Sequence, residues 1–478
     1  MRRRHVRLLF ATPVLIAACG GGSDTTEPTD RGIRIVAGAG VSDTVLAKPL
    51  QALIVEVRSE AKPASGVVVR LESVPSTDST RRFEPTVTVS KLESPYFSGF
   101  FSDTTNASGR VSVVVQLGTV AGRVRLAVSA PELGVTDTAT FTVLPGTVSR
   151  VSLSPRDTTI ASGGSYVIGG YATDRFGNRR DDPVTFAVGP NVRSVDATGR
   201  VTVGTAVGRG AVAVRAGAAL DSARFTVAPD GTMAFLIYSG SGMIATSRLD
   251  GSALKTLVAA ASPAYPNLSP AGDLVAYQQS EADGVVIYVV DRNGIKKPLV
   301  DRAVMRVAAS PHFSGDGQFV YFYGNAVGDT SYAVWRVRKD GTALTRVFTP
   351  GDRFGAGTIG VAPDGSRIAY VEDYTVKLVE LGTGTTVSKS RGGTFPEFSP
   401  DGTRLAYLAG NGILIARVDG TSVIGAAGGL VNNDAGLTWT ADSKWLVVRG
   451  YFGPLLVNAS TGEALTLHFP SYYQFSAR

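Results

Sequence analysis

The sequence predicts an all-β chain in which two β-sandwiches precede a six-bladed β-propeller. Three observations support this fold class. Glycine is abundant, with 56 residues among 478, whereas charged residues make up only 18% and aromatic residues 8%. In the first half, short runs of alternating apolar and polar residues are broken by turn residues, as in strands joined by hairpins. In the second half, one turn motif returns six times at the spacing of a propeller blade.

Residues 1–18 have the form of a secretory signal. Four arginines precede an apolar run from Leu8 to Ala18, which is 11 residues long. A membrane-spanning helix needs roughly 18 or more apolar residues, so this run is too short to be one. No later stretch approaches that length. We therefore expect an exported chain from which this segment is removed.

Cys19 is the only cysteine in the chain. The segment Ile16-Ala17-Ala18-Cys19 resembles the bacterial lipobox, in which the cysteine thiol takes a diacylglycerol. The resemblance implies a lipid anchor in the cell envelope, and Gly20 favours the outer membrane. Whether the protein faces the periplasm or the cell surface stays open. The alternative is an ordinary signal cleaved after Ala18, which leaves a free thiol. Residues 19–31 are glycine-rich and then polar, so we interpret them as a flexible tether.

The formal charge of +7 comes mainly from the leader. Four of the 47 basic residues lie before Cys19 and none of the 40 acidic residues does, so the remaining chain carries +3. No cluster of Lys and Arg with interleaved aromatic residues follows, as binding to a phosphate backbone would require. We therefore expect no nucleic-acid partner, and we expect a monomer.

Residues 32–146 form the first predicted sandwich. Its clearest strands are Ala52 to Val57, Val67 to Leu71, Val111 to Leu117, Val124 to Ala130 and Thr138 to Val143. The segments Asn106 to Val111 and Val120 to Val124 resemble the end of an invasin- or intimin-type bacterial immunoglobulin-like domain. A long polar insertion from Pro75 to Thr104 departs from that pattern.

Residues 147–228 form the second predicted sandwich. Val151 to Pro155, Ala172 to Asn178 and Val195 to Val201 resemble the second common class of bacterial immunoglobulin-like domain, with glycines where hairpins need a positive φ. Such domains imply spacers. A surface adhesin, in which the sandwiches make the contact, is an alternative.

Residues 229–478 carry the repeat. The intervals between the fourth positions of its turns are 41, 45, 48, 37 and 41 residues, which is the length of one four-stranded blade. Proline, aspartate and glycine in this order are turn formers, so the aspartates are interpreted as structural. The six copies are Ala228-Pro229-Asp230-Gly231, Ser269-Pro270-Ala271-Gly272, Ser314-Gly315-Asp316-Gly317, Ala362-Pro363-Asp364-Gly365, Ser399-Pro400-Asp401-Gly402 and the degraded Thr440-Ala441-Asp442-Ser443.

An apolar strand follows each turn, for example Leu274 to Tyr277 and Leu405 to Tyr407. This pattern resembles the TolB-like propeller repeat, a relative of the WD40-like repeats without their Trp-Asp signature. The resemblance implies a protein-docking function. Tyr473-Gln474-Phe475-Ser476 also repeats Pro396-Glu397-Phe398-Ser399, which leads into a turn. We therefore predict that residues 471–476 supply the inner strand of the first blade and close the ring.

The sequence offers little for catalysis, so we predict no catalytic residue, metal or cofactor. After the leader the only histidines are His312 and His468, far apart in the chain. There is no Gly-x-Ser-x-Gly elbow and no phosphate-binding glycine-rich loop before a helix. An enzyme of the polysaccharide lyase or glycosidase type stays open as an alternative. It would need paired carboxylates or metal-binding histidines at the channel mouth, and close clustering of Glu397 with another acid and His312 would favour it.

One position in each blade, just before the apolar anchor of the inner strand, is a candidate ligand contact. Inner strands of a propeller line the central channel, so polar residues there could form the rim of a pocket. In blade order, with the closing strand last, these residues are Asn267, His312, Gly360, Glu397, Thr438 and Gln474. The leading hypothesis is a lipid-anchored envelope scaffold whose propeller binds a protein or polysaccharide. Solvated channel residues without a ligand are the alternative.

Overall fold

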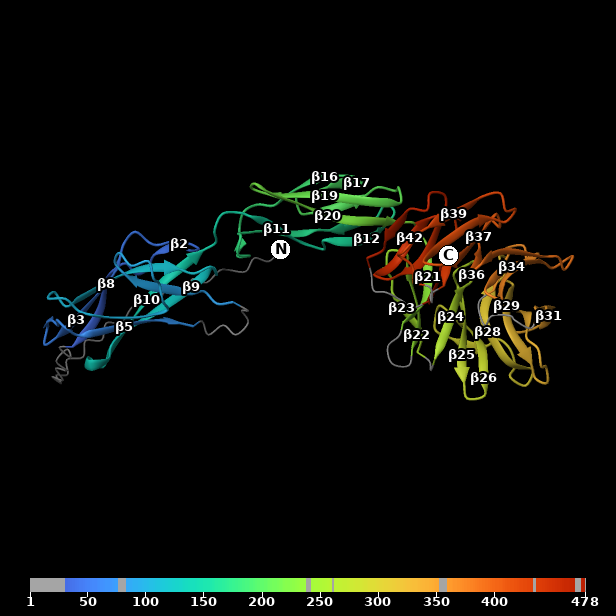
Figure 1. Cartoon of the computed structure of the whole chain (residues 1–478), viewed down its shortest axis with the longest axis horizontal. Helices are drawn as coiled ribbons and strands as arrows, with labels where there is room; N and C mark the ends of the chain where they lie inside the picture. Colours follow the sequence, from blue (N-terminus) through green and yellow to red (C-terminus); the bar gives the residue numbers. More distant parts are fainter. Residues whose placement is uncertain are drawn as a thin grey trace, which may run out of the picture. The chain divides into compact units, whose positions relative to one another are not determined.

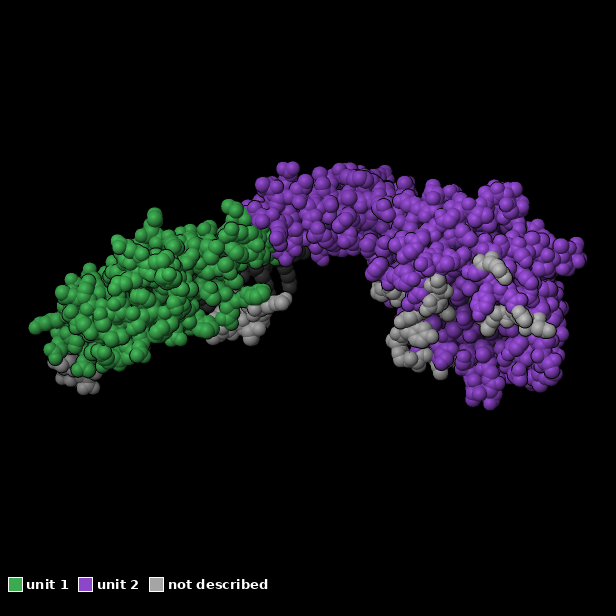
Figure 2. Space-filling view, viewed as in Figure 1, with its two compact units in different colours: residues 1–147, 173–180 green, residues 148–172, 181–478 purple. Residues whose placement is uncertain are grey.

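The computed structural model describes residues 31–75, 83–237, 242–259, 262–351, 359–432, 436–468 and 474–477. Cys19 and most of the predicted tether lie outside these ranges. The chain separates into two compact units (Figure 2). Unit 1 comprises Met1–Thr147 and Thr173–Arg180, and unit 2 comprises Val148–Ala172 and Asp181–Arg478. None of the described residues forms a helix with the length and apolar character that spanning a bilayer requires.

Unit 1 contains two sheets that enclose one core. One has the order β1-β3-β8-β6 with β4 beside β3, and the other β2-β10-β9-β5-β7 (Figure 1). Strand β8 illustrates how the core forms. Its side chains point alternately to the two faces of the sheet, so Val111, Val113 and Val115 face the core. The bounds are β1 Gly32–Ala37, β2 Ser42–Thr44, β3 Leu53–Ser59, β4 Lys62–Pro63, β5 Val68–Val74, β6 Val87–Lys91, β7 Phe100–Thr104, β8 Arg110–Leu117, β9 Gly122–Ala130, the short 3-10 helix η1 Pro131–Leu133, and β10 Val135–Leu144. The strands predicted here from alternation are confirmed.

The segment 173–180, which the sequence assigns to the second sandwich, belongs to unit 1 and contains β15 (Arg179–Arg180). Asp174 accepts a hydrogen bond from the Gly146 backbone N–H at 2.8 Å. The Asn178 side chain donates to the Thr119 carbonyl and accepts from the Ala121 N–H, both at 2.8 Å. The side chains of Asp174 and Asn178 in this turn therefore bind backbone groups of unit 1.

The first part of unit 2 is a second all-β module with its own core. Strand β11 pairs with β14, and two further sheets have the orders β12-β20-β19-β16 and β13-β18-β17. A Cβ at Gly210 would lie 2.2 Å from the Phe225 ring, so only glycine lets this ring pack onto the sheet. The bounds are β11 Arg150–Ser154, β12 Asp157–Ala161, β13 Ser165–Val167, β14 Gly169–Thr173, β16 Thr185–Val188, β17 Val192–Val195, β18 Arg200–Val203, β19 Gly208–Ala216 and β20 Ala219–Ala228.

The rest of unit 2 is a β-propeller, and its described strands form six blades. Blades two and three are joined into one sheet by a parallel bridge between Val285 and Val307. The blades, from inner to outer strand, are β44, β21, β22, β23; β24 to β27; β28 to β31; β32 to β35; β36 to β39; and β40 to β43. Their bounds are β21 Thr232–Ile237, β22 Met243–Arg248, β23 Lys255–Ala259, β24 Pro263–Leu268, β25 Leu274–Glu281, β26 Gly284–Asp291, β27 Lys296–Pro298, β28 Met305–Phe313, β29 Phe319–Ala326, β30 Ala333–Arg338, β31 Thr345–Phe348, β32 Gly360–Val361, β33 Arg367–Glu372, β34 Thr375–Glu380, β35 Thr386–Arg391, β36 Gly393–Phe398, β37 Arg404–Ala409, β38 Gly412–Arg417, β39 Val423–Ala426, β40 Leu437–Trp439, β41 Trp445–Gly450, β42 Gly453–Asn458, β43 Ala464–Thr466 and β44 Gln474–Ala477.

The predicted ring closure is confirmed for residues 474–476, whereas residues 471–473 of the predicted strand lie outside the described part of the chain. Strand β44 pairs antiparallel with β21, with Phe475 opposite Phe235 and Ala477 opposite Met233. The first blade therefore takes its inner strand from the far end of the propeller sequence. This arrangement pairs an edge that β21 would otherwise expose.

The turns after the inner strands have the predicted chemistry. Gly272, Gly317, Gly365 and Gly402 have φ between 66° and 70°, the left-handed conformation that glycine adopts without strain. Asp316 and Asp401 each accept a hydrogen bond at 2.9 Å from a backbone N–H two residues ahead. These aspartates close turns, as the sequence predicts.

Two of the departures from the turn motif, Gly315 and Ser443, have a packing reason. In blade three a glycine, Gly315, replaces proline, because a Cβ there would lie 2.5 Å from the Pro363 carbonyl oxygen of the next blade. In blade six Ser443 replaces glycine and keeps the left-handed conformation at φ 59°. Its hydroxyl accepts a hydrogen bond from the Asp401 N–H at 3.0 Å. The degraded turn therefore ties blade six to blade five.

Candidate functional site

Three inner strands, β24, β28 and β36, contain the same bulge. Their pairing register shifts between Ala264 and Asn267, between Ala309 and His312, and between Thr394 and Glu397. In each case the two skipped residues end in proline. The first skipped residues, Tyr265, Ser310 and Phe395, have left-handed φ values of 50°, 52° and 52°.

A left-handed residue other than glycine costs roughly 1–3 kcal/mol. The cost recurs at the same place in blades two, three and five, where the following proline also fixes its own φ. Repetition of the same strained geometry in three blades indicates a common purpose for the residue that follows each proline. Strain of this kind tends to gather at functional sites.

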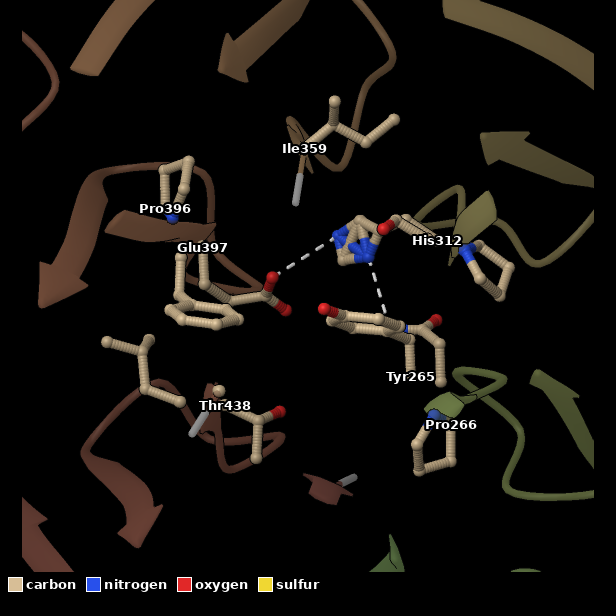
Figure 3. Close-up of a pocket in the computed structure, with 13 residues that line it drawn as sticks. Tyr265, Pro266, His312, Ile359, Pro396, Glu397 and Thr438 are labelled. Carbon is tan, nitrogen blue, oxygen red and sulfur yellow. Dashed lines mark hydrogen bonds and ion pairs between the residues drawn. The ribbon is translucent and has the colours of Figure 1, made fainter. Parts of the chain in front are cut away.

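The residues after the bulges face one cavity in the propeller channel (Figure 3). Asn267, His312 and Glu397 come from β24, β28 and β36, and Thr438 comes from β40. These four residues are between 2% and 9% exposed, so they are shielded from bulk water although they line a void. The cavity volume of about 70 Å³ holds several water molecules or part of a ligand.

The lining combines polar groups with apolar rings. In Figure 3 the side chains of Tyr265, His312 and Glu397 converge on the centre, with Ile359, Pro396 and Pro266 around them. The described lining residues are Tyr265, Pro266, Asn267, Ser310, Pro311, His312, Ile359, Phe395, Pro396, Glu397, Gly436, Leu437 and Thr438.

The structure thus brings four of the predicted contacts together. Gly360 contributes no side chain, and a Cβ there would lie 2.5 Å from the Pro396 carbonyl oxygen. Gln474 belongs to β44, but its side chain lies outside the described part, as does Cys19. Whether a ligand contacts these residues stays a prediction.

Sequence reasoning missed Tyr265, Phe395 and the prolines of the bulges. A signal for them existed, because Tyr265-Pro266-Asn267, Ser310-Pro311-His312 and Phe395-Pro396-Glu397 share a proline before the polar residue. A proline within an inner strand indicates a bulge, since proline cannot donate to the strand ladder.

Asn267 favours one tautomer of His312. The Asn267 Oδ1 accepts a hydrogen bond from the Phe313 backbone N–H at 2.9 Å, which orients the amide. Its Nδ2, a donor only, then lies 3.2 Å from the Nδ1 of His312. In this arrangement Nδ1 is the acceptor, which favours the tautomer with its hydrogen on Nε2.

The Nε2 of His312 faces Glu397 from across the channel, 3.5 Å from Oε2. Blade six holds the backbone of Glu397, because the indole N–H of the fully buried Trp439 donates to its carbonyl oxygen at 3.0 Å. The contacts therefore run from Asn267 through His312 to Glu397 and join blades two, three and five.

The charged or titratable groups among the described lining residues include the imidazole of His312 and the carboxylate of Glu397. His312 presents an N–H to the carboxylate, so its Nε2 is a donor in this arrangement and not a base. The described lining residues contain a single carboxylate, Glu397, whereas glycoside hydrolysis uses a pair. Among the described residues no three His, Cys, Asp or Glu side chains gather as a metal site would require.

The fold and the cavity define an all-β protein whose six-bladed propeller carries a polar, semi-enclosed site in its channel. The assignment of the fold rests on the order and pairing of the strands. No protein-family model matches the sequence, and no curated protein matches it significantly.

Solved structures similar to this chain are propellers of differing function. TolB from Acinetobacter baumannii is 14% identical, with 62% of this chain and 84% of that chain covered and a TM-score of 0.42. A putative TolB from Agrobacterium tumefaciens is 16% identical, with 50% and 88% covered and a TM-score of 0.38. The gluconolactonase XC5397 from Xanthomonas campestris is 15% identical, with 44% and 75% covered and a TM-score of 0.36. At these identities and TM-scores, none of the likenesses assigns a function.

Proposed function

We propose that this chain is a lipid-anchored binding protein of the bacterial cell envelope. The propeller is the binding platform, its channel cavity is the ligand site, and the two N-terminal β-modules are immunoglobulin-like spacers. One observation supports the binding site above all: three strained bulges of identical form direct Asn267, His312 and Glu397 into one cavity. Strain of this kind clusters at sites that hold ligands, which supports the proposal.

Crosslinking on intact membranes tests the binding function. The lipoprotein and its Glu397→Gln variant are crosslinked in place, purified and searched for bound protein or polysaccharide. Glu380→Gln is the matched control, because Glu380 lies on β34 outside the cavity and pairs with Arg367. We expect one ligand to be recovered with the wild type and the control but not with Glu397→Gln. Equal recovery from all three would place binding elsewhere.

Metabolic labelling with an alkyne fatty acid tests the anchor. The sole cysteine lies where a lipobox would place it, so label should enter the wild type and be absent from Cys19→Ser. Membrane fractionation of both forms completes the test. Labelling that survives in Cys19→Ser would contradict the anchor without affecting the cavity.

A further inference from the structure

We infer that the channel cavity takes a neutral, hydroxyl-rich ligand, such as a sugar ring of an oligosaccharide. This inference rests on the proposed binding function and names the chemistry of its ligand. Three properties of the cavity support it: its charge, its mixture of donors and acceptors, and its apolar walls.

The charge of the lining disfavours acidic ligands. No lysine or arginine is among the described residues that line the cavity, whereas the carboxylate of Glu397 is. Recognition of phosphate, sulfate or a uronic acid relies on charge-assisted hydrogen bonds from basic side chains. A buried carboxylate without such donors beside the ligand would repel an anion.

The polar groups offer donors and acceptors side by side. His312 has its hydrogen on Nε2, because Nδ1 accepts from Asn267, and the carboxylate of Glu397 is an acceptor. The Tyr265 side chain reaches toward Glu397 from the opposite wall (Figure 3). A hydroxyl group donates and accepts at once, so it matches such a pair of groups better than a carboxylate, which only accepts, or an ammonium, which only donates.

The walls between these groups are apolar. The bulges place the rings of Pro266, Pro311 and Pro396 on the lining, and Phe395 and Ile359 lie beside them. A sugar ring presents C–H faces between its hydroxyls, and these faces can pack on such surfaces while the hydroxyls reach the polar residues. Small-molecule sites commonly combine apolar walls with a few convergent polar groups in this way.

Calorimetric titration of the full-length lipoprotein in detergent tests the inference with three ligand panels. The panels are neutral oligosaccharides, acidic oligosaccharides such as oligogalacturonate, and amine-bearing chitosan oligomers. We expect binding from the neutral panel alone. Glu397→Gln should lower that affinity by about tenfold or more, because a hydrogen bond to a charged acceptor contributes about 1.5–3 kcal/mol.

Two variants guard against trivial explanations. Glu380→Gln should bind as the wild type does. Asn267→Asp keeps the shape of the amide but replaces its donor with an acceptor, so Nδ1 of His312 would become the protonated nitrogen. We expect Asn267→Asp to weaken ligand binding. We expect Glu380→Gln to leave the thermal unfolding temperature unchanged.

The outcomes separate the ligand class from the binding function. Binding of only the amine-bearing or only the acidic panel, lost in Glu397→Gln, would overturn the neutral ligand and retain the site. The same holds if no oligosaccharide binds while a crosslinked protein is lost in Glu397→Gln. Neutral binding that is unaffected by Glu397→Gln and Asn267→Asp would overturn both the ligand class and the site.

Discussion

In blades two to six the inner strand ends in a turn, and its channel position lies two residues before that turn. The turns have the same conformation from blade to blade, whereas the channel residues differ. The turns repeat: Gly317, Gly365 and Gly402 share one conformation, and even Ser443 adopts it. The channel positions do not repeat, and Asn267, His312 and Glu397 differ in charge and hydrogen-bonding capacity. Blades two to six must each close the same hairpin, whereas a single ligand site needs a different group from each side. In a repeat protein, variation at a fixed position therefore locates the site.

Removing the closing strand should have the largest effect. Deletion of residues 469–478 leaves β21 without its partner β44 and opens the ring. We expect the cooperative unfolding transition of the propeller to be lost or moved to a far lower temperature, measured by calorimetry. Deletion of Arg478 alone is the control, because the pairing ends at Ala477. An unchanged melting profile in the longer deletion would contradict closure by β44.

Neighbouring substitutions in β36 test the division between structure and site. Phe398 is 3% exposed and anchors the strand, so Phe398→Ala should cost about 3–5 kcal/mol of unfolding free energy. Glu397→Gln keeps the volume and should cost less than about 1 kcal/mol while it abolishes ligand recovery. Urea unfolding of both variants measures the difference. A larger loss from Glu397→Gln than from Phe398→Ala would make the channel position structural.

Substitutions at Ser443 test how the degraded turn is compensated. Ser443→Ala keeps the left-handed strain and loses the hydrogen bond from Asp401, so we expect a loss of about 1 kcal/mol. Ser443→Gly loses the same bond but removes the strain, and its stability should lie close to that of the wild type. Thermal unfolding gives both values. A Gly variant less stable than the Ala variant would mean that the left-handed conformation carries no strain to relieve, and an Ala variant as stable as the wild type would mean that the hydroxyl has no compensating function.

The turn aspartates should give the propeller a modest acid sensitivity. Hydrogen bonds from the Ser314 hydroxyl and the Gln318 N–H hold the pKa of Asp316 below its usual value of 3.8. The unfolded chain therefore takes up this proton at a higher pH than the folded chain. The stabilisation is present above the unfolded pKa and is lost as pH falls through the lower folded pKa. Asp316→Asn should lower stability at pH 7, and the deficit relative to the wild type should narrow by pH 3 in urea unfolding.

The features that depend on local pattern could be predicted from the sequence. The turns, the strands of the first sandwich and the closing strand follow from turn residues, alternation and self-similarity. The channel positions Asn267, His312, Glu397 and Thr438 were also predictable, because a repeat in register aligns them. The structure then adds the cavity that these side chains share.

The features that depend on contacts between blades could not be predicted. Tyrosine and phenylalanine do not favour a positive φ, so nothing in their type predicts the conformation of Tyr265 or Phe395. The hydrogen bond from Asn267 to His312 joins residues 45 positions apart in different blades, and no pattern within either strand predicts it. Segment 173–180 belongs to unit 1 for a similar reason, since the backbone groups that it binds lie far away in the sequence.

The pairing of β44 with β21 also sets the order in which the molecule can assemble. The two strands are about 240 residues apart in the sequence, so the first blade must wait with one edge open while the other five are made. Bringing such distant segments together is slow because the chain must pass through many open arrangements first. A chain that is cut short, or stalled before residue 474, would present a bare strand edge. Such an edge is what a protease or chaperone would recognise as a sign of incomplete synthesis.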